Sequence, residues 1–521
     1  MSNLFLITLD AVRRDHLGCY GYSRKITPNL DKLAKEYQKI DWCFTPASYT
    51  SASVPSILSA KYPTHISTRF GITLPYASSL NDLAPITQLK KMGYKTAAFT
   101  ANPITSSSMN RTLNLFFDYF SDTYSETKQS TPYKTSSEVL SEVVAYLKQN
   151  PDNNFIWIHL MDAHGPYVPY TISKFVGDRL WKKQQSLPHL TRIISDTFDH
   201  ETIESILTKP GTQFYQLRDV LKDDQGGIID FQKDPRYYIA QYDLGIQLMD
   251  HTLGRLFQYL QLHNLWEDAT IAIHSDHGET MGENGLYFNH AYLTTPELAL
   301  SPLIFKFGRQ QKASGNVASA IDILPTLLAS KSIPLPRGLD GISLFASSSR
   351  VNIYTIGPKD ISIINQTKRT ITSFHQGDLD YKAHKQPQAQ LLPIKVAQPL
   401  NPLNFANLYC FKYKYHKHTV QFISHSYDEQ DISLLEQCRL DLLKNSDKGN
   451  TRLNLSPARI DNLIETLVSE DSRSVIEVQD QLAEYTTWVK ILQAENKALK
   501  RKIFPGLKLP KWFSQFRSNK I

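Results

Sequence analysis

Three short apolar segments, far apart in the chain, each lead directly to an aspartate. The segments are residues 4–9, 155–160 and 270–274, and the aspartates that follow them are Asp10, Asp162 and Asp276. Each segment has the length of a buried strand, and helical patterns such as that of residues 236–262 lie between them. Alternating strands and helices predict an α/β fold with a doubly wound, mostly parallel sheet. Ligands of such sheets bind at the carboxyl ends of the strands, so we expect the aspartates at one crevice.

The pattern changes three times along the rest of the chain. Residues 171–235 are polar and charged without a strand period, and we interpret them as a lid inserted into a catalytic domain of residues 1–345. Short alternating segments such as 409–415 and 419–424 predict a β-rich C-terminal α+β subdomain at 346–455. A helical segment at 456–504 and a tail at 505–521 complete the predicted organisation.

Residues 475–503 repeat apolar side chains at alternating spacings of three and four. The repeat is formed by Val475, Val478, Leu482, Tyr485, Val489, Leu492, Asn496, Leu499 and Ile503. Such a repeat, sustained over four heptads, predicts a coiled coil, and a polar Asn496 at a core position favours two parallel strands. We therefore expect a parallel homodimer through this segment. The alternative is one amphipathic helix that packs on the body of the protein.

The net charge of +7 comes from the end of the chain. Residues 500–521 carry seven basic side chains and no acidic one, so the remaining residues are balanced, which argues against a nucleic-acid partner. Aromatic and basic residues interleave within 505–521, a composition that suits an anionic membrane surface, although a solvated tail is the alternative. Neither a secretory leader nor a long apolar span is visible, so we expect a cytoplasmic protein, peripheral to the inner face of the membrane if the tail binds there.

Candidate site residues follow from the chemistry of the strand ends. Asp10, Asp276 and the adjacent His277 offer two carboxylates and an imidazole, a set that suits one divalent ion such as Ca²⁺, Mg²⁺, Mn²⁺ or Zn²⁺. Residues 46–63 form a hydroxyl-rich turn before a short apolar helix. A hydroxyl at a helix N-terminus faces backbone N–H groups that favour an anion, and it needs a base or a metal to become a nucleophile.

Five motifs, in order along the chain, resemble those of sulfatases and related members of the alkaline phosphatase superfamily. They are residues 3–21, 27–34, 155–167, 275–286 and 321–344. The resemblance implies the fold expected above and assigns metal ligation to Asp10, Thr50, Asp276 and His277. It places the nucleophile twelve residues before Tyr62, at Thr50, with Ser48, Ser51 and Ser53 as rivals. It also assigns catalytic roles to His164 and His290, and less firmly an anion-binding role to Lys61 or Arg69.

The sequence departs from the sulfatase pattern where the nucleophile is expected. Sulfatases carry Cys-x-Pro-x-Arg, whose cysteine becomes formylglycine, whereas residues 50–54 here are Thr-Ser-Ala-Ser-Val, so no formylglycine is expected. Ala11 also stands where sulfatases have a second aspartate. Threonine or serine phosphoryl intermediates are the rule in related phosphodiesterases and phosphoryl transferases. The spacing of Asp162, His164 and His290 does not match that of two-metal relatives, which favours one metal.

The resemblance therefore favours a metal-dependent ester hydrolase, of the sulfatase or phosphodiesterase kind. It would cleave a phosphate or phosphodiester, or transfer a group from it, through a covalent Thr50 intermediate. The substrate would be a phosphorylated or sulfated small molecule, glycan or lipid head group. A sulfatase that works without formylglycine is the first alternative, and a non-catalytic, membrane-associated scaffold is the second.

Overall fold

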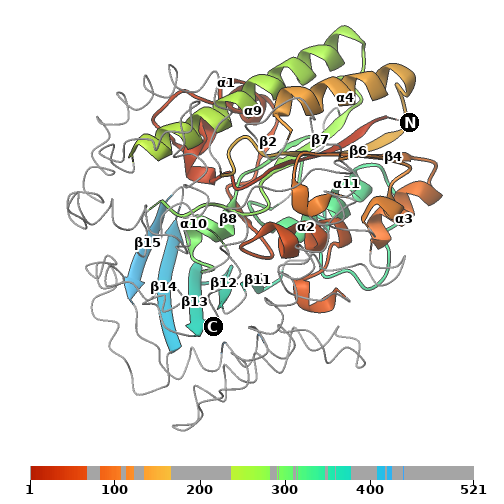
Figure 1. Cartoon of the computed structure of the whole chain (residues 1–521). Helices are drawn as coiled ribbons and strands as arrows, with labels where there is room; N and C mark the ends of the chain where they lie inside the picture. Colours follow the sequence, from red (N-terminus) through yellow and green to blue (C-terminus); the bar gives the residue numbers. More distant parts are fainter. Residues whose placement is uncertain are drawn as a thin grey trace, which may run out of the picture. The chain divides into compact units, whose positions relative to one another are not determined.

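The computed structural model covers the whole chain and describes most of its N-terminal two thirds (Figure 1). The described residues are 2–66, 83–106, 113–122, 134–165, 236–281, 290, 293–308, 312–313, 315–346, 350–357, 360–376, 408–416, 419–424, 434 and 438. The predicted lid at 171–235, the predicted coiled coil at 475–503 and the basic tail at 505–521 lie outside them. These three predictions, and the homodimer and membrane contact that depend on them, stay predictions.

A seven-stranded sheet forms the centre of the fold, with its strands in the order β2-β9-β7-β1-β6-β4-β5. The strands are β1 (Leu4–Leu9), β2 (Gln38–Lys39), β4 (Lys95–Thr100), β5 (Tyr119–Ser121), β6 (Asn154–Leu160), β7 (Thr270–His274) and β9 (Leu303–Lys306). Strands β7, β1, β6, β4 and β5 are parallel, while β9 and β2 form an antiparallel edge. The predicted mostly parallel sheet is therefore confirmed.

Side chains of β1 alternate between two cores, one on each face of the sheet. Phe5, Ile7 and Leu9 point to the core that contains α1 (Pro28–Glu36), α4 (Ser136–Gln149) and α9 (Arg236–Leu262). Leu4 and Leu6 point to the core that contains α2 (Thr50–Ser59), α3 (Ala84–Lys91) and α11 (Ile323–Ser330). Figure 1 shows these two helical layers on opposite sides of the sheet. Because β1 is buried on both faces, its sequence is an almost continuous hydrophobic run and not an alternation of apolar and polar residues.

The helices on one face are fixed by carboxylates at their N-termini. Asp250 of α9 accepts hydrogen bonds from the backbone N–H groups of Asn29 (3.2 Å) and Leu30 (2.8 Å) at the start of α1. Asp162, which follows β6, accepts from the backbone N–H of Ser136 at 3.0 Å and also from its hydroxyl. Asp162 thus caps α4, which gives it a structural use that the strand-end pattern alone did not indicate.

Short elements complete the body of the fold. A second sheet contains β3 (Trp42–Phe44), β8 (Leu300–Ser301) and β10 (Val317–Ser319), and α10 (Pro296–Ala299) precedes β8. Six 3-10 helices are described, namely η1 (Arg14–His16), η2 (Gly18–Tyr20), η3 (Pro63–His65), η4 (Pro103–Thr105), η5 (Leu113–Phe116) and η7 (Ala320–Asp322). Across the described residues, no helix combines the length and the apolar character needed to span a membrane.

A five-stranded antiparallel sheet lies where the sequence predicts the β-rich segment. Its strands, in order, are β11 (Asn352–Ile356), β12 (Asp360–Asn365), β13 (Thr370–Gln376), β14 (Leu408–His416) and β15 (Thr419–Ser424). Its core is continuous with β3, since the ring of Tyr415 lies 4.6 Å from that of Trp42. The backbone N–H of Ile356 also donates to the carbonyl of Pro46 at 2.9 Å, in the turn before α2. The division of the chain at residue 345 stays a prediction.

Candidate active site

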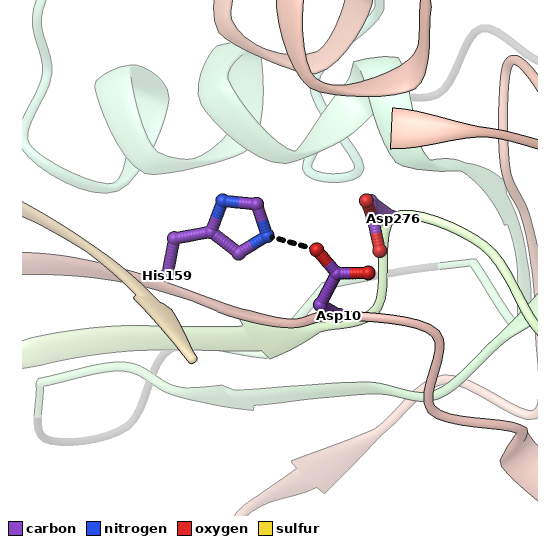
Figure 2. A group of neighbouring side chains, drawn as sticks. All are labelled: Asp10, His159 and Asp276. Carbon is purple, nitrogen blue, oxygen red and sulfur yellow. Dashed lines mark ion pairs between the residues drawn. The ribbon is translucent and has the colours of Figure 1, made fainter. Parts of the chain in front are cut away.

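The order of the central strands brings two predicted ligands together. Strands β7 and β1 are neighbours with Thr8 opposite His274, so Asp10 and Asp276 both emerge just beyond the carboxyl ends of adjacent strands. Both side chains are completely buried. Figure 2 shows the two carboxylates facing each other, with the ring of His159 beside Asp10.

Asp10 is held on one side by two residues that sequence analysis missed. Its Oδ2 accepts a hydrogen bond from Nδ2 of Asn102 at 2.6 Å and lies 2.9 Å from Nε2 of the buried His159. Burial alone would raise the pKa of Asp10, but neighbouring imidazoles, first that of His164, outweigh burial and hold this pKa well below its usual range. Asp10 is therefore ionised at neutral pH, and its Oδ1 is left to face the site.

His277 directs one ring nitrogen at the same point. Its Nδ1 donates to the carbonyl of Gly278 at 2.7 Å, which leaves the lone pair on Nε2. That atom lies 3.7 Å from Oδ1 of Asp10 and 3.6 Å from Oδ2 of Asp276. Gly278 allows this geometry, because a Cβ there would lie 1.9 Å from the carbonyl oxygen of Glu297.

The two carboxylate oxygens that face His277 have no hydrogen-bond partner among the described residues. They are Oδ1 of Asp10 and Oδ2 of Asp276, both without solvent contact. Burying an unpaired anionic oxygen is costly unless a cation compensates it. One ligand atom each of Asp10, His159 and Asp276 also lies within 4.8 Å of the others. The donor set of carboxylate oxygens and imidazole nitrogens thus fits a divalent metal ion, with His159 as a further candidate ligand.

The predicted nucleophile is the first residue of α2. Thr50 is buried, and its Oγ1 lies 3.1 Å from Nε2 of His277, the nitrogen that faces the two unpartnered carboxylate oxygens. Among the rival hydroxyls, that of Ser53 donates to the carbonyl of Asp276 at 2.6 Å, which ties α2 to the ligand loop. The structure describes no side-chain hydrogen bond of Ser48 or Ser51 to the ligand residues. Of these hydroxyls, that of Thr50 has a described contact with the ring of His277.

The predicted catalytic histidines form a row beside His277. The ring of His290 lies 4.4 Å from that of His277 and 5.2 Å from that of His164. Nδ1 of His290 lies 3.4 Å from Oε1 of the fully buried Glu279, another residue that sequence analysis missed. Of the two weaker candidates, Lys61 is half-buried and Arg69 lies outside the described residues.

Ala11, which stands where sulfatases have a second aspartate, contacts the site through its backbone N–H. Ala11 has a left-handed conformation with φ of 57°, and its N–H donates to Oδ1 of Asp276 at 3.2 Å. A peptide group therefore approaches Asp276 where sulfatases place a carboxylate. The hydroxyl of Ser275 accepts from the N–H of Val12 at 3.0 Å, which adds a second link between the two ligand segments.

Known proteins share this fold and parts of the sequence. An ulvan-active sulfatase from Formosa agariphila is 25% identical over 350 residues, which cover 66% of this chain and 64% of the relative. A solved structure of a protein in complex with its substrate D-glucosamine-2-N,6-O-disulfate matches with a TM-score of 0.55 and 15% identity, over 87% of this chain and 99% of the other. The phosphonate monoester hydrolase SpPMH from Silicibacter pomeroyi matches with a TM-score of 0.52 and 16% identity, over 87% and 97%.

The sequence matches to the first curated relatives span between 19% and 64% of their own length. The match to the family itself is longer, since the sulfatase family covers residues 2–333, which include every strand of the central sheet. This chain therefore belongs to the sulfatase family.

Proposed function

We propose that this protein is a metal-dependent hydrolase that cleaves a phosphate ester or phosphodiester, or transfers a group from it, with Thr50 as the nucleophile. The observation that carries the proposal is the approach of Oγ1 of Thr50 to Nε2 of His277 at 3.1 Å, because that nitrogen itself lies 3.7 Å and 3.6 Å from the unpartnered oxygens of Asp10 and Asp276. Sulfatase-family membership supports ester hydrolysis in general.

Asp10, Thr50, Asp276 and His277 would hold a single divalent ion, which is Ca²⁺, Mg²⁺, Mn²⁺ or Zn²⁺ by the hardness of the donors. When bound, such an ion lowers the pKa of a nearby hydroxyl and stabilises negative charge on the ester oxygens. The ion also compensates the two buried carboxylates, which in its absence repel each other.

The residues of the chain then act in two chemical steps. Oγ1 of Thr50 releases its proton to water and attacks phosphorus, while the bond from phosphorus to the leaving oxygen breaks. The leaving oxygen takes a proton from His164 or His290. Water or an acceptor hydroxyl next gives its proton to that histidine and attacks the phosphoryl group on Thr50, while the bond to Oγ1 breaks. Oγ1 then takes up a proton from water, which regenerates the threonine. Because Thr50 opens α2, the first N–H groups of the helix face the transferred group and stabilise its charge.

The nucleophile favours phosphorus over sulfur. Formylglycine hydrate releases sulfate when it collapses to an aldehyde, but a threonine sulfate ester has no such route and needs direct attack by water. The ulvan-active sulfatase and the phosphonate monoester hydrolase among its relatives indicate that both classes of ester need testing. The second candidate function, a sulfatase that works without formylglycine, is supported by that sulfatase match.

A trapping experiment tests the proposal. The purified protein is loaded with each divalent ion, mixed with matched 4-nitrophenyl phosphate, phosphodiester, phosphonate and sulfate esters, and quenched in acid for mass spectrometry. We expect a phosphoryl adduct on the peptide that contains Thr50, no adduct in Thr50→Ala, and a normal adduct in Ser59→Ala, which removes a hydroxyl at the other end of α2. Faster turnover of the sulfate would favour the sulfatase alternative. Retained phosphoester turnover in Thr50→Ala would exclude Thr50 as the nucleophile.

The scaffold alternative requires neither a metal nor turnover. Metal analysis of the purified protein separates the two, because a scaffold would retain no stoichiometric divalent ion. We also propose that 475–503 pairs with a second copy and that 505–521 binds anionic membranes on the cytoplasmic side. Light scattering of a variant truncated before residue 475, and sedimentation with anionic and neutral vesicles, test these two proposals separately.

A further inference from the structure

The hydroxyl of Tyr242 joins two backbone groups of the segment that follows Asp10. It donates to the carbonyl of Ala11 at 2.7 Å and accepts from the N–H of Arg13 at 2.7 Å. Tyr242 belongs to α9 and is completely buried. The side chain of a helix on one face of the sheet therefore bridges the turn that carries a proposed metal ligand.

This turn has a conformation that its own sequence disfavours. Ala11 has φ of 57°, in the left-handed region where a side chain with a Cβ is strained. The conformation persists where surrounding contacts overdetermine it. The two hydrogen bonds of the Tyr242 hydroxyl, to the carbonyl of Ala11 and from the N–H of Arg13, hold the backbone that directly follows the Cα of Ala11 and provide such contacts.

The strained turn at Ala11 contributes to the orientation of the Asp276 carboxylate, a proposed metal ligand. With Ala11 in this conformation, its N–H donates to Oδ1 of Asp276 at 3.2 Å, and the N–H of His277 donates to the same oxygen at 3.0 Å. The other oxygen of that carboxylate, Oδ2, then points toward Nε2 of His277, 3.6 Å away, and has no hydrogen-bond partner. Rotation of the carboxylate would remove Oδ2 from the point where the donors converge.

We propose that Tyr242 is a positioning residue that acts through Ala11 to orient the Asp276 carboxylate, and that it thereby sets the affinity of the site for a divalent cation. The inference rests on the metal site of the proposed function. Partners that orient metal ligands typically change metal affinity by roughly 10- to 100-fold when they are removed.

Binding of Mn²⁺ to the full-length protein tests the proposal without any substrate. Free Mn²⁺ is measured by electron paramagnetic resonance during titration of the chelator-treated protein. Tyr242→Phe keeps the ring and removes only the hydroxyl, and we expect it to weaken Mn²⁺ binding about tenfold.

Tyr20→Phe is the matched control for the loss of a buried hydroxyl. The Tyr20 hydroxyl also bridges two backbone groups, since it donates to the carbonyl of Ile40 at 3.0 Å and accepts from the N–H of Leu303 at 2.8 Å. It makes no contact with Ala11 in the structure. We expect Tyr20→Phe to lower the melting temperature as Tyr242→Phe does, but to leave the affinity for Mn²⁺ unchanged.

Rescue by glycine distinguishes positioning from general support of the fold. Glycine adopts positive φ without a steric penalty, so Ala11→Gly in the Tyr242→Phe background should recover most of the lost affinity. Tyr242→Phe with normal affinity, or an affinity loss that Ala11→Gly leaves unchanged, would overturn the role assigned to Tyr242. A wild-type protein that binds no Mn²⁺, Zn²⁺, Mg²⁺ or Ca²⁺ would instead refute the proposed metal site.

Discussion

Oγ1 of Thr50 lies 3.1 Å from Nε2 of His277, although 227 positions separate the two residues in the sequence. Thr50 opens α2, which covers one face of the central sheet, while His277 follows β7 in the middle of that sheet. The hydrogen bond from Ser53 to the carbonyl of Asp276 holds the two segments in this relation at 2.6 Å. The proposed nucleophile and the proposed ligand loop are therefore fixed to each other by the fold.

This relation predicts different outcomes for two substitutions of similar size at Thr50. Thr50→Val keeps the shape of the side chain but replaces Oγ1 with a methyl group, so we expect kcat to fall by at least about a thousandfold. Thr50→Ser keeps the oxygen and should stay within roughly tenfold of wild type. Steady-state rates on the best phosphoester measure both. Equal rates for the valine and serine variants would contradict a role for Oγ1.

The unpartnered carboxylates predict that one substitution has opposite effects on stability with and without metal. In chelator-treated protein, Asp276→Asn removes one of two facing buried charges, and we expect a higher melting temperature than wild type. With metal at about 100 times its Kd, the wild type gains about 2.7 kcal/mol that the variant lacks, so the order reverses. Thermal unfolding at fixed pH with chelator or metal measures the reversal.

A surface carboxylate provides the control for that reversal. Asp152 is exposed and precedes the N-terminal end of β6, whereas His159 lies near the carboxyl end of that strand, so Asp152→Asn should behave like wild type under both conditions. An Asp276→Asn variant that is less stable than wild type in chelator would show that the carboxylate is compensated within the protein, and would remove the main evidence for a cation.

The parts of the fold that the sequence predicted are those encoded by local patterns. Strands β1 and β7 and helix α9 lie at the predicted residues, because each is a continuous apolar run or a helical repeat with clear ends. Asp10 and Asp276 come together because both follow strands of one parallel sheet. The same reasoning did not anticipate that Asp162 caps α4, since no local pattern shows which helix start lies beside a strand end.

The residues that sequence analysis missed depend on the order of the strands. His159 lies within β6 and Asn102 follows β4. They contact Asp10 only because β6 lies beside β1 on the side opposite β7, and β4 lies beside β6. The one available signal for His159 was an imidazole inside an otherwise apolar strand. No sequence pattern could indicate the proposed role of Tyr242, because that role depends on a hydroxyl that extends from α9 to the backbone of the turn after β1.

Ser332 also has a left-handed backbone conformation, at the exposed C-terminal end of α11, and this conformation predicts how two glycine substitutions change stability. Ser332 follows the end of α11 with φ of 54°, and the N–H of Ile333 closes the helix on the carbonyl of Leu328 at 3.0 Å. Ser332 is exposed, so its replacement loses no buried contact. Ser332→Gly should stabilise the protein by about 0.5–1 kcal/mol. Ala329→Gly, inside the same helix, should destabilise it by about 1 kcal/mol.

Chemical denaturation measures both α11 variants under one set of conditions. We expect changes of opposite sign in the free energy of unfolding. At position 332 glycine relieves the strain of a positive φ, whereas at position 329 it replaces a good helix former and loses more conformational entropy on folding. Destabilisation by both substitutions would show that the helix end does not adopt the left-handed conformation.

The buried Lys306 predicts an alkaline dependence of stability. Burial lowers the pKa of Lys306 to about 8, although its Nζ donates to the carbonyl of Ala269 at 2.8 Å. The unfolded chain binds the proton up to a higher pH than the folded one, so folding stability rises as pH increases from about 8 to 10.5. Partial solvation limits the gain to about 2 kcal/mol. Lys306→Met should remove this rise, as urea unfolding at pH 7.5 and 10 would show. An unchanged slope in that variant would assign the effect to other groups.

The row of histidines predicts how activity depends on the leaving group. If His290 supplies the proton, His290→Ala should slow alkyl phosphodiesters, whose leaving oxygen needs protonation, by roughly 10²–10⁴-fold. It should hardly affect 4-nitrophenyl esters, whose leaving group departs as a stable anion. Glu279, 3.4 Å from His290, should produce the same selectivity in weaker form when it is replaced by glutamine. A plot of log kcat/KM against the pKa of the leaving group measures the effect. Equal losses for all leaving groups would assign His290 to substrate binding and leave His164 as the proton donor.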